Sequence, residues 1–291
     1  MEFLTSLLNG LSSGGTYAII AIGYTMVYGI AKMLNFAHGD IIMVGGYAMF
    51  STLLLINQPV VALIFAIVFC MILGVCIERF AYRPLRGASP LAVLITAIGV
   101  SSLLQSLAQI IFGAAPKMPT RLQISGAIHI GSLAISYGTI VTLAVTVVLM
   151  VALTVFVKYS KVGRAMVAVS EDRGAAQLMG INTNAIIAIT FAIGSALAAV
   201  AAYLMLMKAP SLTNTLGAMP GIKAFTAAVI GGIGSIPGAM LGGVLLGVIE
   251  SLSLSIPVLA PFTDAIEFAI LIVILLVKPA GLLGKTRREK V

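Results

Sequence analysis

Charged side chains are scarce in this sequence. Asp, Glu, Lys and Arg make up 9% of the 291 residues, whereas a soluble domain carries roughly 25%. Hydrophobic residues make up 60%, and the mean hydropathy is +1.15. No soluble fold can bury so much apolar surface. The composition therefore excludes a soluble domain and predicts an all-α, polytopic integral membrane protein.

Metal ligands and catalytic groups are also scarce. The two cysteines, Cys70 and Cys76, share one apolar segment and face different sides of a helix, so they cannot bridge within it. The two histidines, His38 and His129, have no cysteine nearby. The stretch PAGLLGKT (279–286) resembles a phosphate-binding loop, but it has Pro279 in place of the first glycine and follows an apolar span. We therefore expect no enzyme activity, no metal site, no cofactor and no nucleotide bound in this way.

The net charge of +8 is concentrated in a few places. Each basic cluster follows an apolar stretch, which is the pattern of cytoplasmic loops in membrane proteins rather than of a nucleic-acid-binding face. Twelve of the 17 Lys and Arg residues lie in three clusters of three, four and five: Arg79, Arg83, Arg86; Lys158, Lys161, Arg164, Arg173; and Lys278, Lys285, Arg287, Arg288, Lys290.

Apolar segments long enough to cross a bilayer recur along the whole chain. We count eight to nine: 4–30, 41–56, 60–77, 91–112, 137–157, 185–207, a glycine-rich stretch at 224–237, 239–256 and 262–277. All three basic clusters fall on one side if each element crosses. The sequence thus predicts a single transmembrane domain over 1–291, with its N-terminus and loop 113–136 outside. Its C-terminus and a coupling loop, 158–184, are expected in the cytoplasm.

Polar residues interrupt the first apolar pair at NFAHGD. Asn35, His38, Gly39 and Asp40 lie here, and ionisable groups at membrane depth are costly and often functional. Two interpretations are open at this stage. The motif is either a short cytoplasmic turn or part of a translocation path.

Glycines interrupt a second region, AVIGGIGSIPGAMLGG (228–243), and make a continuous helix there unfavourable. Its glycines serve either close helix packing or a broken helix beside the path. The residues that we assign to the path here are Gly231, Gly232, Gly234, Ser235 and Pro237.

Two further acids, Glu250 and Glu267, lie within apolar segments. We favour pairing with a charge on a neighbouring helix or subunit over a role in substrate binding.

A polar segment, VAVSEDRGAAQLMGIN (167–182), stands out in the coupling loop. It predicts a short helix over 171–179, with Ser170 as N-cap and Gly180 after its end. Glu171 and Asp172 suit the positive end of the helix dipole. Small residues, Ala175 and Ala176, allow close approach, and Leu178 offers an apolar anchor. A helix this short must dock, either on its own domain or in a cytoplasmic partner.

Four stretches together resemble one known family: 9–40, 77–87, 163–182 and 223–243. They are similar to the permease subunits of bacterial ABC importers for branched-chain amino acids, of the LivH type. The resemblance implies the ABC importer permease fold in a bacterial inner membrane. It makes Ser170, Glu171, Asp172, Ala175, Ala176, Leu178 and Gly180 the coupling helix that contacts the ATPase.

The resemblance also implies partners and a substrate. The expected partners are a second homologous permease, two cytoplasmic ATP-binding subunits, a periplasmic or extracellular amino-acid-binding protein and membrane lipid, with no nucleic acid. The expected substrates are leucine, isoleucine and valine. Alternatives are a related importer for a sugar or for urea or another amide, and an ion-coupled secondary carrier in which Asp40 and Glu250 serve the coupling.

Overall fold

A computed structural model describes residues 2–130 and 133–284 of the chain. Within them, eight helices are long and apolar enough to cross a membrane. These are α1 (Glu2–Ala31), α2 (His38–Leu55), α3 (Pro59–Ile77, continued to Leu85 by π-helical and 3-10 turns), α4 (Pro90–Phe112), α5 (Tyr137–Tyr159), α8 (Thr183–Lys208), α10 (Ile236–Ser255) and α11 (Thr263–Val277, after the 3-10 turn Ala260–Phe262). The predicted all-α membrane architecture is confirmed.

The remaining elements are short. They are α6 (Lys161–Glu171), α7 (Arg173–Leu178), α9 (Ala218–Gly231), a 3-10 turn at Thr120–Leu122, and an antiparallel hairpin of β1 (Ala127–Ile130) and β2 (Leu133–Ser136). No pattern in loop 113–136 had predicted this hairpin.

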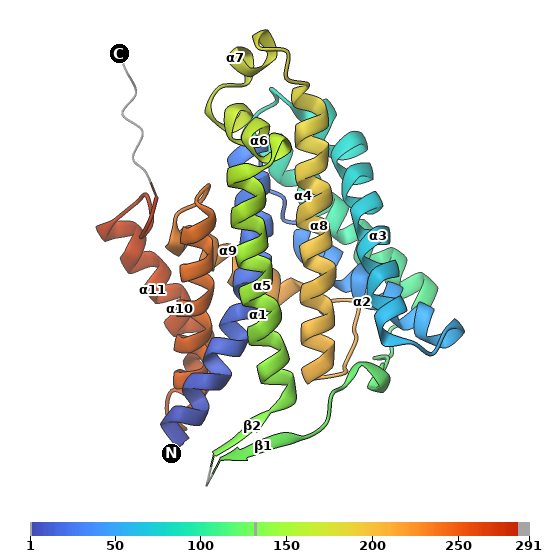
Figure 1. Cartoon of the computed structure of the whole chain (residues 1–291), viewed down its shortest axis with the longest axis vertical. Coiled ribbons are helices and arrows are strands. Elements are labelled where there is room, and N and C mark those ends of the chain that lie inside the picture. Colours follow the sequence, from blue (N-terminus) through green and yellow to red (C-terminus); the bar gives the residue numbers. More distant parts are fainter. Residues whose placement is uncertain (1, 131–132, 285–291) are drawn as a thin grey trace.

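Helix α1 forms the centre of the molecule and packs on α5, α8, α9 and α10 (Figure 1). Its closest contact is with α10, where glycines let the backbones approach. A Cβ atom added at Gly14 would lie 2.8 Å from the Cα of Val244, and one at Gly10 would lie 2.9 Å from the Cα of Val248. Small residues at such crossings are the usual basis of helix association in membranes.

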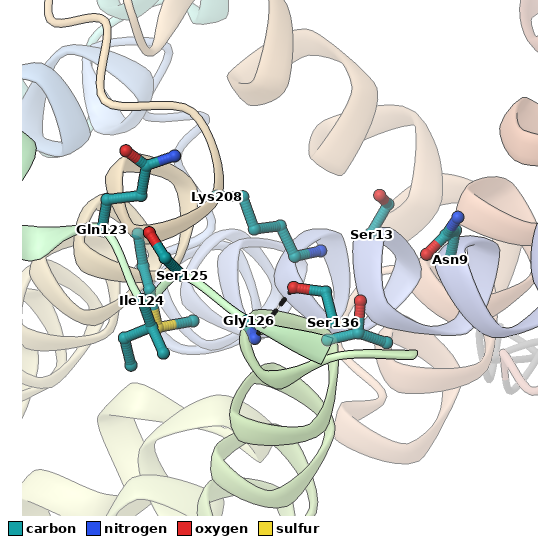
Figure 2. Close-up of a pocket in the computed structure, with 11 residues that line it drawn as sticks. Asn9, Ser13, Gln123, Ile124, Ser125, Gly126, Ser136 and Lys208 are labelled. Carbon is teal, nitrogen blue, oxygen red and sulfur yellow. Dashed lines mark hydrogen bonds between the residues drawn. The ribbon is translucent and has the colours of Figure 1, made fainter. Parts of the chain in front are cut away.

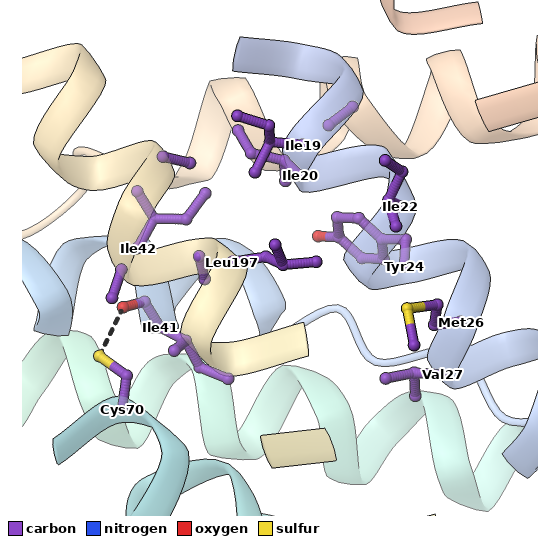
Figure 3. Close-up of a cluster of buried hydrophobic side chains, with 14 of the residues drawn as sticks. Ile19, Ile20, Ile22, Tyr24, Met26, Val27, Ile41, Ile42, Cys70 and Leu197 are labelled. Carbon is purple, nitrogen blue, oxygen red and sulfur yellow. Dashed lines mark hydrogen bonds between the residues drawn. The ribbon is translucent and has the colours of Figure 1, made fainter. Parts of the chain in front are cut away.

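Buried aliphatic side chains pack around residues 19–27 of α1 (Figure 3). Ile19, Ile20 and Ile22 of α1 are fully buried, as are Ile41 and Ile42 at the start of α2. The thiol of Cys70, on α3, lies 3.7 Å from the Ile41 carbonyl oxygen. Cys70 and Cys76 are both free.

The glycine-rich region differs from the element predicted at 224–237. Helix α9 begins earlier, at Ala218, and ends at Gly231, and α10 already begins at Ile236. With 14 residues α9 is about 21 Å long, which is short of the ~30 Å hydrocarbon core. Its first turn lies inside the bundle, where Gly217 and Gly221 pack against Gly39 of α2.

The two ends of the bundle differ (Figure 1). The ends of α3 and α5, together with α6 and α7, lie at one end, and the hairpin and the start of α1 lie at the other. Two of the basic clusters, and Lys278 of the third, follow helices that run toward the α7 end. Lys285, Arg287, Arg288 and Lys290, and the last two residues of PAGLLGKT, lie outside the described residues. The sidedness inferred from the basic clusters stays a prediction.

Candidate functional site

The first break separates α1 from α2 at residues 32–37. The polar residues of the NFAHGD motif, at the end of the break and the start of α2, are buried: Asn35 is 3% exposed, His38 1% and Asp40 3%. The Tyr82 hydroxyl donates to Asn35 Oδ1 at 2.8 Å, and Gln105 Nε2 of α4 donates to Asp40 Oδ1 at 2.8 Å. A burial this deep does not fit an exposed cytoplasmic turn, so the motif belongs to the interior of the bundle.

The first turn of α2 meets the first turn of α9. A Cβ atom added at Gly39 would lie 2.5 Å from the Gly217 carbonyl oxygen, and one at Gly221 would lie 3.0 Å from the Gly39 Cα. Only glycine allows two backbones to approach so closely. The sequence predicted two interrupted regions, but it gave no sign that the start of α9 joins the first of them.

The second break lies between α9 and α10. Gly232 and Gly234 have φ angles of +108° and +94°, which L side chains rarely adopt. Ser235 then caps α10 by accepting a hydrogen bond from the Gly238 amide at 3.2 Å, and Pro237 stands in the first turn. The backbone is therefore broken here, as predicted. Close packing also occurs, because Gly231 lies against Gly238 of α10.

The two breaks approach each other beside the last turns of α1. A Cβ atom added at Gly29 would be 3.4 Å from the Cα of Gly234. Asn35 of the first break and Ile233 of the second line one small cavity of about 10 Å³. Asn35 Nδ2 and Thr25 Oγ1 are buried in its wall without a hydrogen-bond partner among the described residues. Unsatisfied polar groups at this depth mark a place where the packing is not optimised for stability alone.

An ion-pair cluster surrounds Lys223 of α9. The Lys223 ammonium lies 2.5 Å from Glu250 Oε1, 2.9 Å from Asp264 Oδ1 and 3.3 Å from Glu267 Oε1. The Tyr17 hydroxyl of α1 donates to Glu250 at 3.0 Å. The expected charge pairing of Glu250 and Glu267 is confirmed, and its partner is Lys223, which no sequence pattern had indicated. The cluster ties α9 to α1, α10 and α11.

The polar segment 167–182 forms two helices rather than the single one predicted. Ser170 is not an N-cap, because it lies within α6 and its hydroxyl donates to the Val167 carbonyl at 2.7 Å. The cap is Asp172, which adopts an extended conformation and accepts from the Ala175 amide at 3.0 Å. Helix α6 is itself capped by Ser160, so it continues through 170 and displaces the start of the second helix to Arg173.

The end of α7 agrees with the prediction. Gly180 has φ of +80° and its amide donates to the Gln177 carbonyl at 2.9 Å, while the Ile181 amide donates to Ala176 at 3.0 Å. This pair of bonds is the Schellman motif. It turns the chain so that Leu178 and Met179 stand at the tip of the molecule, 90% and 82% exposed.

Helix α7 is tied to the first break through Arg173. Its guanidinium donates to the carbonyl oxygens of Ile30, at 3.2 Å, and Ala31, which are the last residues of α1. Burial, and to a lesser degree the positive charge of Arg86, lower the pKa of Arg173, but a guanidinium stays protonated in proteins. A cation at these carbonyls complements the negative end of the α1 dipole.

A cavity of about 670 Å³ brings the two sets of predicted residues together. Ser170 and Glu171 of α6 line it from one side, and Gly234, Ser235 and Pro237 line it from the other. The structure thus places the second break beside the coupling loop, whereas His38, Gly39 and Asp40 lie deeper in the bundle.

Eight candidate spanning helices, two interrupted regions and a short exposed helix at one end, all within the described residues, define a polytopic membrane protein. The model of the branched-chain amino acid transport system permease component family matches residues 6–275. The chain belongs to this family. It is therefore a multi-pass membrane protein, and the bacterial inner membrane is the location consistent with the family.

Full-length relatives agree. The chain is 46% identical to the high-affinity branched-chain amino acid transport system permease protein BraD of Pseudomonas aeruginosa and 45% identical to LivH of Salmonella typhimurium. Each match covers 100% of this chain and 98% of the relative. The fructose import permease protein FrcC of Rhizobium meliloti is 32% identical over 41% of the chain and 34% of its own length.

Proposed function

We propose that this chain is the permease subunit of an ABC importer for leucine, isoleucine and valine. It pairs with a second homologous permease, two cytoplasmic ATP-binding subunits and an amino-acid-binding protein on the outer side. The full-length similarity to BraD and LivH supports the substrate class, whereas the similarity to the sugar permease covers less than half of the chain. The other subunits supply ATP hydrolysis, and the permease pair forms the path.

The observation that carries the coupling proposal is the exposed tip of α7. Leu178, the last residue of a capped helix of six residues, is 90% exposed, and Met179, which follows it, is 82% exposed. So short a helix is not stable alone, and two large apolar side chains in water indicate a missing partner. We infer that this tip docks in a cleft of the ATPase.

Movement of the docked helix then reaches the path through Arg173. When ATP binding closes the ATPases, α7 moves with them and displaces the end of α1, since Arg173 holds its last carbonyls. The first break begins at the next residue, and the second break lies against α1 at Gly29. Both breaks are therefore adjacent to the element that the ATPases move, which supports alternating access.

The test replaces the tip without disturbing the fold. Leu178→Ser combined with Met179→Ser should reduce co-purification of the ATPases and uptake of labelled leucine into proteoliposomes, while pairing with the second permease persists. Lys161→Ser, an exposed change on the adjacent α6, is the matched control. Unchanged assembly and uptake in the double variant would mean that α7 is not the coupling element.

The two small residues of α7 are not equivalent as probes. Ala175 is exposed, so Ala175→Glu tests the contact with a partner. Ala176 is only 4% exposed and packs within its own chain, so Ala176→Glu would disturb the fold of the permease itself.

The energy source separates this function from an ion-coupled carrier. Proteoliposomes that hold the whole transporter should take up leucine only with ATP inside and the binding protein outside. Uptake driven by a sodium or proton gradient without ATP would favour the carrier.

A further inference from the structure

A polar cavity lies at the end of the bundle opposite α7 (Figures 1 and 2). It has a volume of about 520 Å³, within the usual range of small-molecule sites. Its walls come from the start of α1, the chain before β1, the start of α5 and the end of α8. Neither broken segment contributes to it. Under the orientation proposed above, it lies on the outer side.

The cavity lining holds one positive charge and no acidic side chain. Lys208, at the end of α8, lines it and makes no direct hydrogen bond or ion pair with another residue in the described part of the chain. None of the eleven lining residues drawn in Figure 2 carries a carboxylate. An ammonium held beside hydroxyl and amide groups, without an acid among them, favours an anionic ligand.

Two further features point into the same space. Helix α5 starts here, with Ser136 as its cap and the Gly138 amide in its first turn, so its positive dipole end faces the cavity. Thr139 also lines the cavity; it is 5% exposed, and its hydroxyl has no hydrogen-bond partner among the described residues. This hydroxyl at the cavity wall is therefore free to bond a ligand or water.

The other side of the cavity suits the rest of an amino acid. Asn9 and Ser13 of α1 face Lys208 in Figure 2 and supply neutral oxygen atoms that can accept hydrogen bonds from an ammonium. Met207 and Ile124 add apolar surface. The cavity therefore offers a cation and a helix end for a carboxylate, polar side chains for an ammonium, and apolar side chains for an aliphatic group. This combination matches an aliphatic α-amino acid better than an uncharged sugar or amide.

We propose that this cavity is an outer binding site for the substrate, in which Lys208 and the start of α5 bind the α-carboxylate. The proposal rests on the proposed function. An amino acid released on the outer side would occupy this site before it reaches the two breaks. No covalent step is involved.

The experiment measures binding of labelled leucine to the purified transporter, with all its subunits but without the binding protein. Lys208→Gln should weaken binding about tenfold or more, because it removes a charge-assisted hydrogen bond, and Lys208→Arg should restore most of it. Thr139→Val, which keeps the shape but removes the hydroxyl, should weaken binding by a smaller factor. Arg121→Gln, which removes a positive charge from loop 113–136 outside the cavity, is the matched control and should bind as the wild type does.

Ligand variants test the chemistry. Leucinamide, which lacks the carboxylate, should compete poorly with leucine for the wild-type transporter. Its own affinity should be the same for Lys208→Gln as for the wild type, because it makes no contact that the variant removes. Equal competition by unlabelled leucine and leucinamide in the wild-type transporter would overturn the proposal. Unchanged leucine binding in Lys208→Gln would also overturn it. A second arm measures binding of labelled leucine in the presence of inorganic phosphate, and in vesicles with or without phosphatidylglycerol. Loss of leucine binding in anionic vesicles alone would identify a lipid headgroup as the occupant and also overturn it.

Failure of this site is distinguishable from failure of the proposed function. If the wild-type transporter takes up leucine with ATP and the binding protein but Lys208→Gln neither binds nor transports it differently, only the outer site is wrong. If Lys208→Gln weakens association of the binding protein while leucine binding persists, the cavity contacts that protein instead. If the assembled wild-type transporter moves no branched-chain amino acid, the proposed function is wrong.

Discussion

At the scale of single residues, Lys223 is the centre of an ion-pair cluster. It is the one cation among three carboxylates, and Glu250, Glu267 and Lys223 itself are largely buried. Removing one partner of a buried ion pair leaves an uncompensated charge and typically costs about 3–5 kcal/mol. We expect Lys223→Met to lower the thermal unfolding temperature of the detergent-solubilised protein strongly, and Lys223→Arg to lower it less.

Glu267→Gln provides the contrasting variant, because Lys223 keeps Glu250 and Asp264 and the unpartnered Glu267 Oε2 is replaced by a neutral group. It should unfold close to the wild-type temperature. If Glu267→Gln were as destabilising as Lys223→Met, the cluster would depend on the total charge rather than on the lysine.

Gly39 shows how one missing side chain decides a contact between helices. The Cβ of Gly39→Ala would meet the backbone of Gly217, which has no flexible atoms to move aside. We expect this variant to lose thermal stability, and uptake with it. Gly99→Ala on α4 is the matched control, since a Cβ there has no atom within 4 Å. Equal stability of both variants would show that α2 and α9 can separate without cost.

At the scale of elements, the break between α9 and α10 sets the shape of the second interrupted region. Gly232→Val requires a β-branched side chain at φ of +108° and places its Cβ against the segment 280–284 that covers the break. We expect the protein to insert and to bind its partners, because the spanning helices are unchanged, but to transport poorly. Full uptake by this variant, compared with Gly99→Val, would mean that the break does not take part in transport.

At the scale of the whole molecule, the basic clusters predict that the α7 end of the bundle faces the cytoplasm and the hairpin end faces outside. In a background with Cys70 and Cys76 replaced by alanine, Lys161→Cys on α6 should react with a membrane-impermeant maleimide only from the cytoplasm. Arg121→Cys, in the loop before β1, should react only from outside. Both positions are exposed, so access depends on the side of the membrane. Labelling of position 161 from outside would reverse the orientation and, with it, the assignment of α7 to the cytoplasm.

The sequence by itself determined the class of the protein and the positions of its interruptions. Apolar runs predict spanning helices because the bilayer offers no other partner for backbone groups. The breaks were predictable because Gly and Pro act locally on the chain, and Gly180 ends α7 as its position indicated. The Ser170 prediction failed although capping is also local, because two candidate caps, Ser160 and Asp172, flank a helix that continues through it.

Only the tertiary structure decided which interrupted segments meet and which charges pair. Gly39 and Gly217 are distant in sequence, and nothing in either motif specifies the other. Lys223 lies in an ordinary apolar helix and gains its partners from α10 and α11, and Lys208 becomes notable only because folding leaves it unpaired beside a cavity. Local propensity fixes where a helix breaks, whereas the energy of a buried polar or charged group depends on its neighbours in space, which packing alone provides.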